Sequence, residues 1–177
     1  MSDTKRLATA ALLAVIIAIV KGKILPPPLG DLLVIFEAML LGLSFILIGS
    51  GGATYTAAIA GLLINFQFPE YGPLPFLLAL LYGVLVDFFS VVLKVKVNGL
   101  VSARRLSLSL TVSSAITGPV AYYLTLPLLT NAPSDTSFYA TIILIGVASG
   151  AAAGFLAARI WERNLKGRFA SPTVPAV

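Results

Sequence analysis

Two carboxylates, Glu37 and Asp87, interrupt long apolar runs in this chain of 177 residues. An ionised carboxylate is costly inside a membrane, so an acidic residue in an apolar run usually faces a cavity or a partner and marks a functional site. Glu37 lies about one to two helical turns into its run, a depth that suits a pocket open to one membrane surface. Two roles stay open for Glu37: it binds a ligand, or it pairs with Lys21 or Lys23.

Asp87 lies further along its own run, nearer to the basic segment that follows. We interpret this carboxylate as structural. It forms an ion pair with Arg104 or Arg105, or it accepts hydrogen bonds at a helix N-terminus, where free backbone N–H groups favour negative charge.

Four further residues extend the candidate site: Asn65, Tyr122, Tyr123 and Tyr139. If the apolar runs alternate in direction across a membrane, all four lie towards the same surface as Glu37. Aromatic walls with a few placed polar groups are typical of a small-molecule site. Each tyrosine taken singly is also explained as an interfacial belt residue. We predict that these four residues and Glu37 bind the substrate.

The chain contains neither cysteine nor histidine. This composition excludes disulfides, thiolate metal sites, His-ligated haem and the Ser-His-Asp triad. The sequence also lacks a nucleotide-binding P-loop and a carboxylate pair at hydrolase spacing. We therefore expect no enzymatic activity, no cofactor and no metal. The formal charge of +5 does not indicate nucleic acid, because the basic residues flank apolar runs.

The apolar runs predict the elements that position these residues. The chain is 58% apolar and 11% charged, whereas soluble domains have about 25% charged residues. The six runs cover residues 7–20, 32–48, 53–66, 76–93, 106–126 and 138–160. A Gly-Ser-Gly-Gly turn at residues 49–52 argues against fusing the second and third runs, which would leave five helices. We predict an all-α membrane protein: a bundle of six transmembrane helices forming one domain over residues 1–170, with a disordered tail at 171–177.

The lysine and arginine residues orient this bundle. With the N-terminus in the cytoplasm, 10 of the 12 basic residues lie on the inner side: Lys5, Arg6, Lys94, Lys96, Arg104, Arg105, Arg159, Arg163, Lys166 and Arg168. Only Lys21 and Lys23 lie outside. Cytoplasmic segments carry an excess of basic residues, so we predict that both termini are cytoplasmic and that the protein lies in the plasma membrane.

Small residues recur at a spacing of four in three of the runs. The three stripes are Ala10, Ala14 and Ala18; Ala53, Ala57 and Gly61; and Gly146, Gly150 and Gly154. Such stripes let helix backbones approach closely in lipid. Packing within the bundle explains each stripe. Docking to another membrane protein is the alternative, strongest for the first stripe, which follows Lys5 and Arg6.

These features resemble the substrate-binding S-component of an energy-coupling factor (ECF) transporter over nearly the whole chain. The opening segment TKRLATAALLA, residues 4–14, resembles the start of that family, whose first helix carries an Ala-xxx-Ala face. Here that face consists of Ala10 and Ala14, with Ala18 one turn further. The glycine-rich segment at residues 146–163, which ends in basic residues, resembles the family's last helix.

The resemblance implies high-affinity capture of a vitamin or similar micronutrient at the outer face. The protein would dock through helix one onto a membrane coupling protein, and two cytoplasmic ATPases would drive release of the substrate inside. The family's pocket involves the first outer loop and helices four to six, which Tyr122, Tyr123 and Tyr139 fit. Glu37 favours a cationic or hydrogen-bond-donating ligand, such as a thiamine precursor.

The alternative is a structural or accessory subunit of a larger membrane complex, for example a respiratory or secretion assembly, with no cofactor of its own. That hypothesis predicts no outward pocket, and small-residue stripes that pack against permanent partners.

Overall fold

The computed structural model describes residues 3–23, 33–97, 100–130 and 136–166. Its six α-helices are α1 (Asp3–Lys23), α2 (Leu33–Ile48), α3 (Gly52–Gln67), α4 (Leu74–Val92), α5 (Ala103–Thr130) and α6 (Thr136–Ile160). Each predicted run coincides with one helix to within about one turn at either end. The all-α class and the six helices are therefore confirmed. The predicted tail at 171–177 lies outside the described residues.

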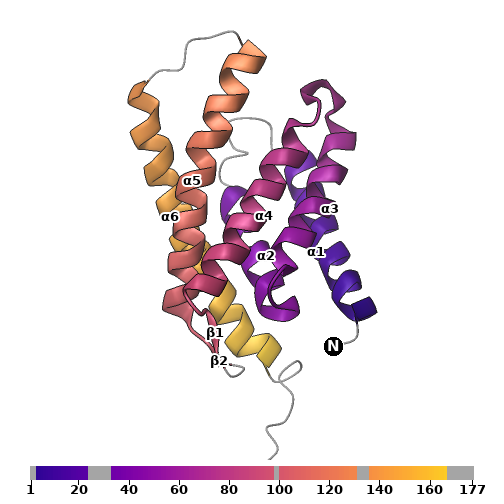
Figure 1. Cartoon of the computed structure of the whole chain (residues 1–177), viewed down its shortest axis with the longest axis vertical. Helices are drawn as coiled ribbons and strands as arrows, with labels where there is room; N and C mark the ends of the chain where they lie inside the picture. The colour runs from indigo at the N-terminus through magenta and orange to yellow at the C-terminus, as the bar shows by residue number, and fades with distance from the viewer. Residues whose placement is uncertain (1–2, 24–32, 98–99, 131–135, 167–177) are drawn as a thin grey trace, which may run out of the picture.

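Helix α2 lies at the centre of the bundle and contacts each of the other five helices. It is apolar on all sides, which is the pattern of a buried helix, and most of its described residues are buried. Helices α1 and α3 pack on one side of it, and the α5–α6 pair packs on the other (Figure 1).

Two described segments are long and apolar enough to cross a membrane by themselves: Leu74–Val92 and Tyr139–Leu165. The second continues α6 into a π-helical turn, Trp161–Leu165. Helix α2 is equally apolar, but its 16 residues span only about 24 Å. Helix α5 is long enough at 28 residues, but serine and threonine along its length lower its hydropathy.

The glycine stripe of α6 packs directly on the backbone of α5. A Cβ added at Gly150 would lie 2.5 Å from the carbonyl oxygen of Leu110, and one at Gly154 would overlap Ser107. The alanine stripe of α3 faces α4 in the same way, because a Cβ at Gly83 would lie 2.5 Å from the Cβ of Ala57. Both stripes therefore serve packing within the bundle.

Asp87 binds the N-terminus of α3. Its carboxylate accepts hydrogen bonds from the backbone N–H groups of Ala53 (3.2 Å) and Thr54 (2.7 Å), and from the Thr54 hydroxyl (2.6 Å). The tight turn before α3 is the predicted one, with Gly49 and Gly51 at positive φ, 101° and 86°. The helix-terminus interpretation of Asp87 is confirmed.

A small hairpin lies between α4 and α5, where the sequence predicted only a basic loop. Strands β1 (Lys96–Val97) and β2 (Leu100–Val101) pair antiparallel. Val95 anchors the hairpin in the core with no exposed surface. The Lys96 ammonium donates to the carbonyl of Ile46, near the C-terminal end of α2, at 3.0 Å.

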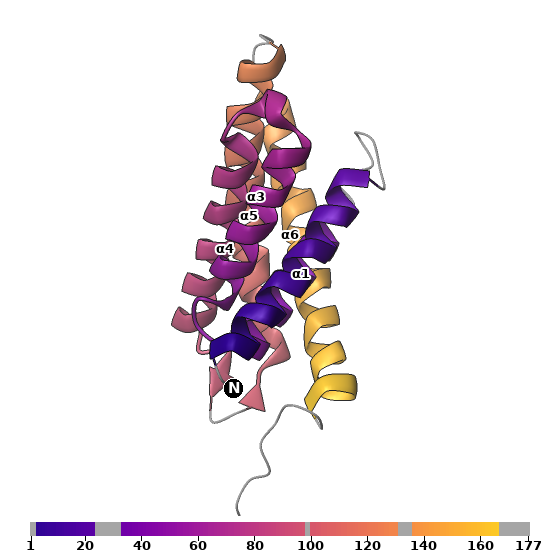
Figure 2. The same ribbon diagram turned by 90° about the vertical axis from the view of Figure 1, so that its right-hand side faces the viewer.

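The start of α1, the hairpin and the end of α6 lie together at one end of the bundle (Figures 1 and 2). We call this the basic end. It carries the exposed residues Lys5, Arg6, Lys94, Lys96, Arg104, Arg105, Arg159, Arg163 and Lys166.

Candidate functional site

A cavity of about 380 Å³ lies in the half of the bundle opposite the basic end. Its walls come from the end of α1, the start of α2, the end of α3, the start of α4, and the halves of α5 and α6 that face away from the basic end. All six helices therefore contribute to one enclosure. The polar side chains of its lining include Lys21, Glu37, Tyr82, Ser114, Thr117 and Thr125.

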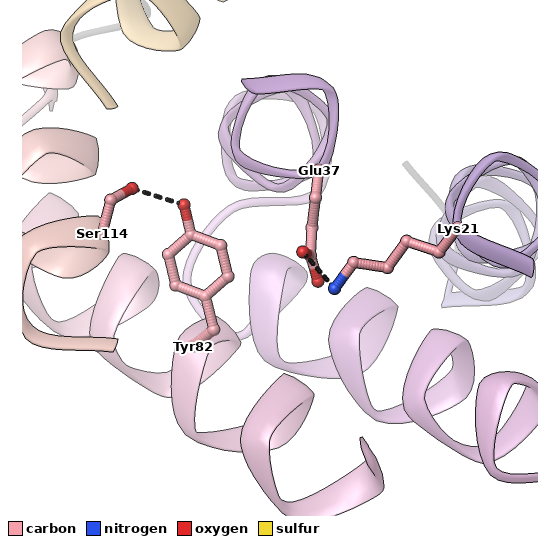
Figure 3. Close-up of polar contacts among 4 residues, drawn as sticks. All are labelled: Lys21, Glu37, Tyr82 and Ser114. Carbon is pink, nitrogen blue, oxygen red and sulfur yellow. Dashed lines mark hydrogen bonds and ion pairs between the residues drawn. The ribbon is translucent and has the colours of Figure 1, made fainter. Parts of the chain in front are cut away.

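Glu37 and Lys21 form an ion pair in this wall. The Lys21 ammonium lies 2.5 Å from the Glu37 carboxylate (Figure 3). The Glu37 side chain is only 7% exposed, whereas the Lys21 side chain is 34% exposed. Both roles that the sequence left open are thus compatible, since Glu37 pairs with Lys21 and lines the cavity. The side chain of Lys23 lies outside the described residues.

Tyr82 and Ser114 form a second polar pair that the sequence analysis missed. Their hydroxyl oxygens lie 2.7 Å apart, and both residues are buried. The Tyr82 ring lies between Ser114 and the ion pair (Figure 3). Tyr82 was overlooked because it stands alone in the most apolar part of α4.

The face of α5 that lines the cavity does have a sequence signal. Ser114, Thr117, Gly118, Ala121 and Thr125 recur every three or four residues, which is the spacing of one helix face. Small and hydroxyl-bearing residues on one face of a long helix indicate either close packing or a wet surface. This face of α5 lines the cavity from Ser114 to Thr125.

The two threonine hydroxyls act mainly as acceptors towards the cavity. The Thr117 hydroxyl donates to the Ser113 carbonyl at 2.9 Å, and the Thr125 hydroxyl donates to the Ala121 carbonyl at 2.6 Å. Each hydroxyl has one proton, which this bond occupies, and its remaining lone pair can accept.

The predicted aromatic residues divide between the cavity and its surroundings. Tyr122 lines the cavity. The ring of Tyr139 packs edge-on against the ring of Tyr122, with the two centroids 5.7 Å apart. Tyr123 is 59% exposed, as an interfacial residue would be. Asn65 is not in the described lining, where its neighbour Ile64 stands instead. The Asn65 Oδ1 atom is buried and has no hydrogen-bond partner among the described residues.

Apolar side chains complete the walls, among them Ile64, Leu78, Ile142 and Ile145. Among the described residues no group of three or more acidic side chains is placed to hold a metal ion. The cavity is thus equipped to bind a small molecule with an apolar body and a polar end. It offers one carboxylate, one ammonium and several hydroxyls for that end.

The alanine stripe of α1 does not lie on the surface. Ala10, Ala14 and Ala18 are 1%, 0% and 2% exposed, and α1 packs against α2 and α3. The stripe therefore packs within the bundle, which is one of the two roles that the sequence left open for it. A partner could contact these side chains only if α1 separated from its neighbours, so docking through this face stays a prediction.

Comparisons with family models, with curated proteins and with solved structures found no match to this chain. The resemblance to ECF S-components therefore stays a prediction. The cavity, its ion pair and the contrast between the two ends of the bundle are the observations that bear on function.

Proposed function

We propose that this protein is a membrane-embedded six-helix bundle that captures a small organic molecule, such as a vitamin or related micronutrient, at the outer face of the plasma membrane. It would act as the S-component of an ECF-type importer and perform no chemistry itself. The observation that carries the proposal is the cavity of about 380 Å³ into which all six helices place side chains, with the buried Glu37 carboxylate in its wall.

The surface of the bundle supports membrane embedding of all six helices. Large apolar side chains are exposed on every outer helix, among them Leu12, Ile19, Phe66, Phe88, Leu108, Leu144 and Phe155. Soluble monomers rarely expose contiguous apolar surface on this scale. The short helix α2 is shielded by its neighbours and need not match the bilayer thickness on its own.

The distribution of charge supports the orientation. The basic end would face the cytoplasm, because cytoplasmic segments carry excess lysine and arginine. The cavity lies in the opposite half, so it would open towards the outside. Capture from outside and interaction with cytoplasmic machinery would then use opposite ends of the same bundle.

ATP-driven uptake requires an ATPase, and the sequence of this chain has no nucleotide-binding P-loop. A membrane coupling protein and two cytoplasmic ATPases would supply it. The accessory-subunit alternative predicts no pocket in the outer half, so the cavity favours capture.

Native mass spectrometry of the gently extracted protein tests the proposal. We expect a stoichiometric small molecule bound to the wild type. Ala121→Trp should release it, because Ala121 lines the cavity. Ala152→Trp, on the exposed surface of α6, is the matched control and should retain it. Stable partners that carry haem or iron–sulfur centres, with no small ligand on this chain, would favour the accessory subunit instead.

A further inference from the structure

The two partners of the cavity's ion pair are held very differently. Glu37 lies in the second turn of the central helix and is 7% exposed, so its carboxylate is fixed within the bundle. Lys21 lies in the last turn of α1, and a third of its side chain is exposed. A lysine ammonium on a flexible four-carbon stem can leave for water at small cost, whereas the carboxylate cannot.

Without Lys21, more acceptors than donors would be offered to a ligand by the Glu37 carboxylate and the hydroxyls of Thr117, Thr125, Tyr82 and Ser114. Glu37 would offer two carboxylate oxygens. Thr117 and Thr125 have already donated their protons to backbone carbonyls. Of the two protons on Tyr82 and Ser114, one lies in the hydrogen bond between them. Such a wall suits a ligand that carries positive charge and donates hydrogen bonds.

From this arrangement we infer that the cavity takes an organic ammonium ion, and that Lys21 is a tethered substitute that occupies the ammonium position until the ligand arrives. The inference rests on the proposed capture function and names its substrate class. The ligand's ammonium displaces the Lys21 ammonium from Glu37, and the Lys21 side chain turns towards solvent at the end of α1.

The neighbouring groups fit this exchange. The Tyr82 ring lies beside the ion pair (Figure 3) and lines the same cavity. Ile64, Leu78 and Ile142 provide apolar wall for the body of the ligand. The exchange keeps Glu37 paired at every stage, because one ammonium replaces another, and a buried carboxylate left alone would be costly.

The test uses fluorinated phenethylammonium as the probe, with fluorinated phenethyl alcohol as its neutral isostere. Binding is followed by fluorine NMR on the full chain in nanodiscs of zwitterionic lipid. Lys21→Met removes the internal competitor, so the dissociation constant of the amine should fall by about tenfold. The matched control is Lys5→Met, which removes an exposed lysine at the other end of α1. It should leave the dissociation constant of the amine unchanged. Glu37→Gln should abolish amine binding in both backgrounds.

A second measurement observes the displacement itself. Carbon-labelled dimethyl-lysine groups report the surroundings of each ammonium, and the Lys21 signal should move towards that of exposed Lys5 when the amine is added. Lys21→Arg assigns the signal. If Lys21→Met does not fold, Lys21→Gln, which also lacks a competing cation, replaces it.

Three results would overturn the inference. Amine affinity that is unchanged or weaker in Lys21→Met contradicts displacement. Equal binding of the alcohol and the amine contradicts the cationic class. A fluorinated phenylalanine zwitterion that binds the wild type better than the amine, and is lost in Lys21→Met, assigns Lys21 to a ligand carboxylate. Each of these leaves capture intact if mass spectrometry finds a small molecule, so the two proposals can fail separately.

Discussion

The two buried carboxylates occupy contrasting halves of the molecule. Asp87 lies towards the basic end, where three donors on Ala53 and Thr54 hold its oxygens through bonds of 2.6 to 3.2 Å. Glu37 lies in the cavity half, where one flexible ammonium, that of Lys21, holds it. Two of the donors to Asp87 are backbone groups at a helix terminus and cannot move without unfolding α3. The partner of Glu37 can move without disturbing any helix.

Packing differs between the halves in the same sense. Helix backbones approach most closely at Gly154, towards the basic end, and at Gly83, midway along α4, where an added Cβ would overlap the neighbouring helix. In the cavity half, Gly61 and Gly146 also pack closely, with an added Cβ 2.9 Å from a neighbouring helix, but there the helices leave a cavity of about 380 Å³ between them. A closed half that fixes the helices and an open half with exchangeable contacts are what a binding protein needs.

The largest expected effect comes from overpacking the interface of α1. Ala14 has no exposed surface, so Ala14→Trp forces a large ring between packed helices and should destabilise the fold by about 3 kcal/mol or more. Val15→Trp, one residue along and on the exposed face, is the control and should be nearly neutral. Thermal unfolding in detergent measures both. A stable Ala14→Trp protein would mean that α1 can leave its neighbours, which would favour docking through the alanine face.

The next effect separates the two carboxylates directly. Asp87→Ala leaves the donors of α3 without their acceptor, which should lower the free energy of unfolding by roughly 2 to 3 kcal/mol. Glu37→Ala frees a lysine that can reach water, so its cost should stay below about 1 kcal/mol. Reversible unfolding in mixed detergent micelles compares the pair. Equal losses would contradict the division into a structural and an exchangeable carboxylate.

The sequence predicted the helices well because their signals are local. Apolar runs gave all six helices to within about one turn, and Gly49 to Gly52 predicted the turn that precedes α3. That Asp87 is structural followed from the cost of a carboxylate in an apolar run, which needs only neighbouring residues. Its partner stayed open between an arginine and a helix N-terminus, because Ala53 and Thr54 lie 34 and 33 residues away.

The site was predicted only in part, because which face a helix presents depends on its packing. Glu37 and Tyr122 do line the cavity, whereas Asn65, Tyr123 and Tyr139 do not appear in its described lining. Tyr82 was missed because its partner, Ser114, lies 32 residues away on another helix. Helix α2 has no polar face to orient it, so its pattern, although typical of a buried helix, did not indicate which side would face the cavity.

The smallest expected effect refines the open half. Tyr82→Phe removes one hydroxyl from the pair with Ser114, and the serine can then donate to the carbonyl one turn earlier in α5, so the loss of stability should be at most about 1 kcal/mol. Amine affinity should fall by a few-fold, about as expected for one hydrogen bond, if the spare proton of the pair donates to the ligand. Tyr123→Phe, whose side chain is exposed, controls for the loss of a phenol at this end and should change neither quantity. Fluorine NMR titration measures the amine affinity, and thermal unfolding measures the stability. A Tyr82→Phe protein that loses stability but keeps its affinity would mean that the pair serves to hold α4 to α5, and the exchangeable part of the site would then reduce to Glu37 and Lys21.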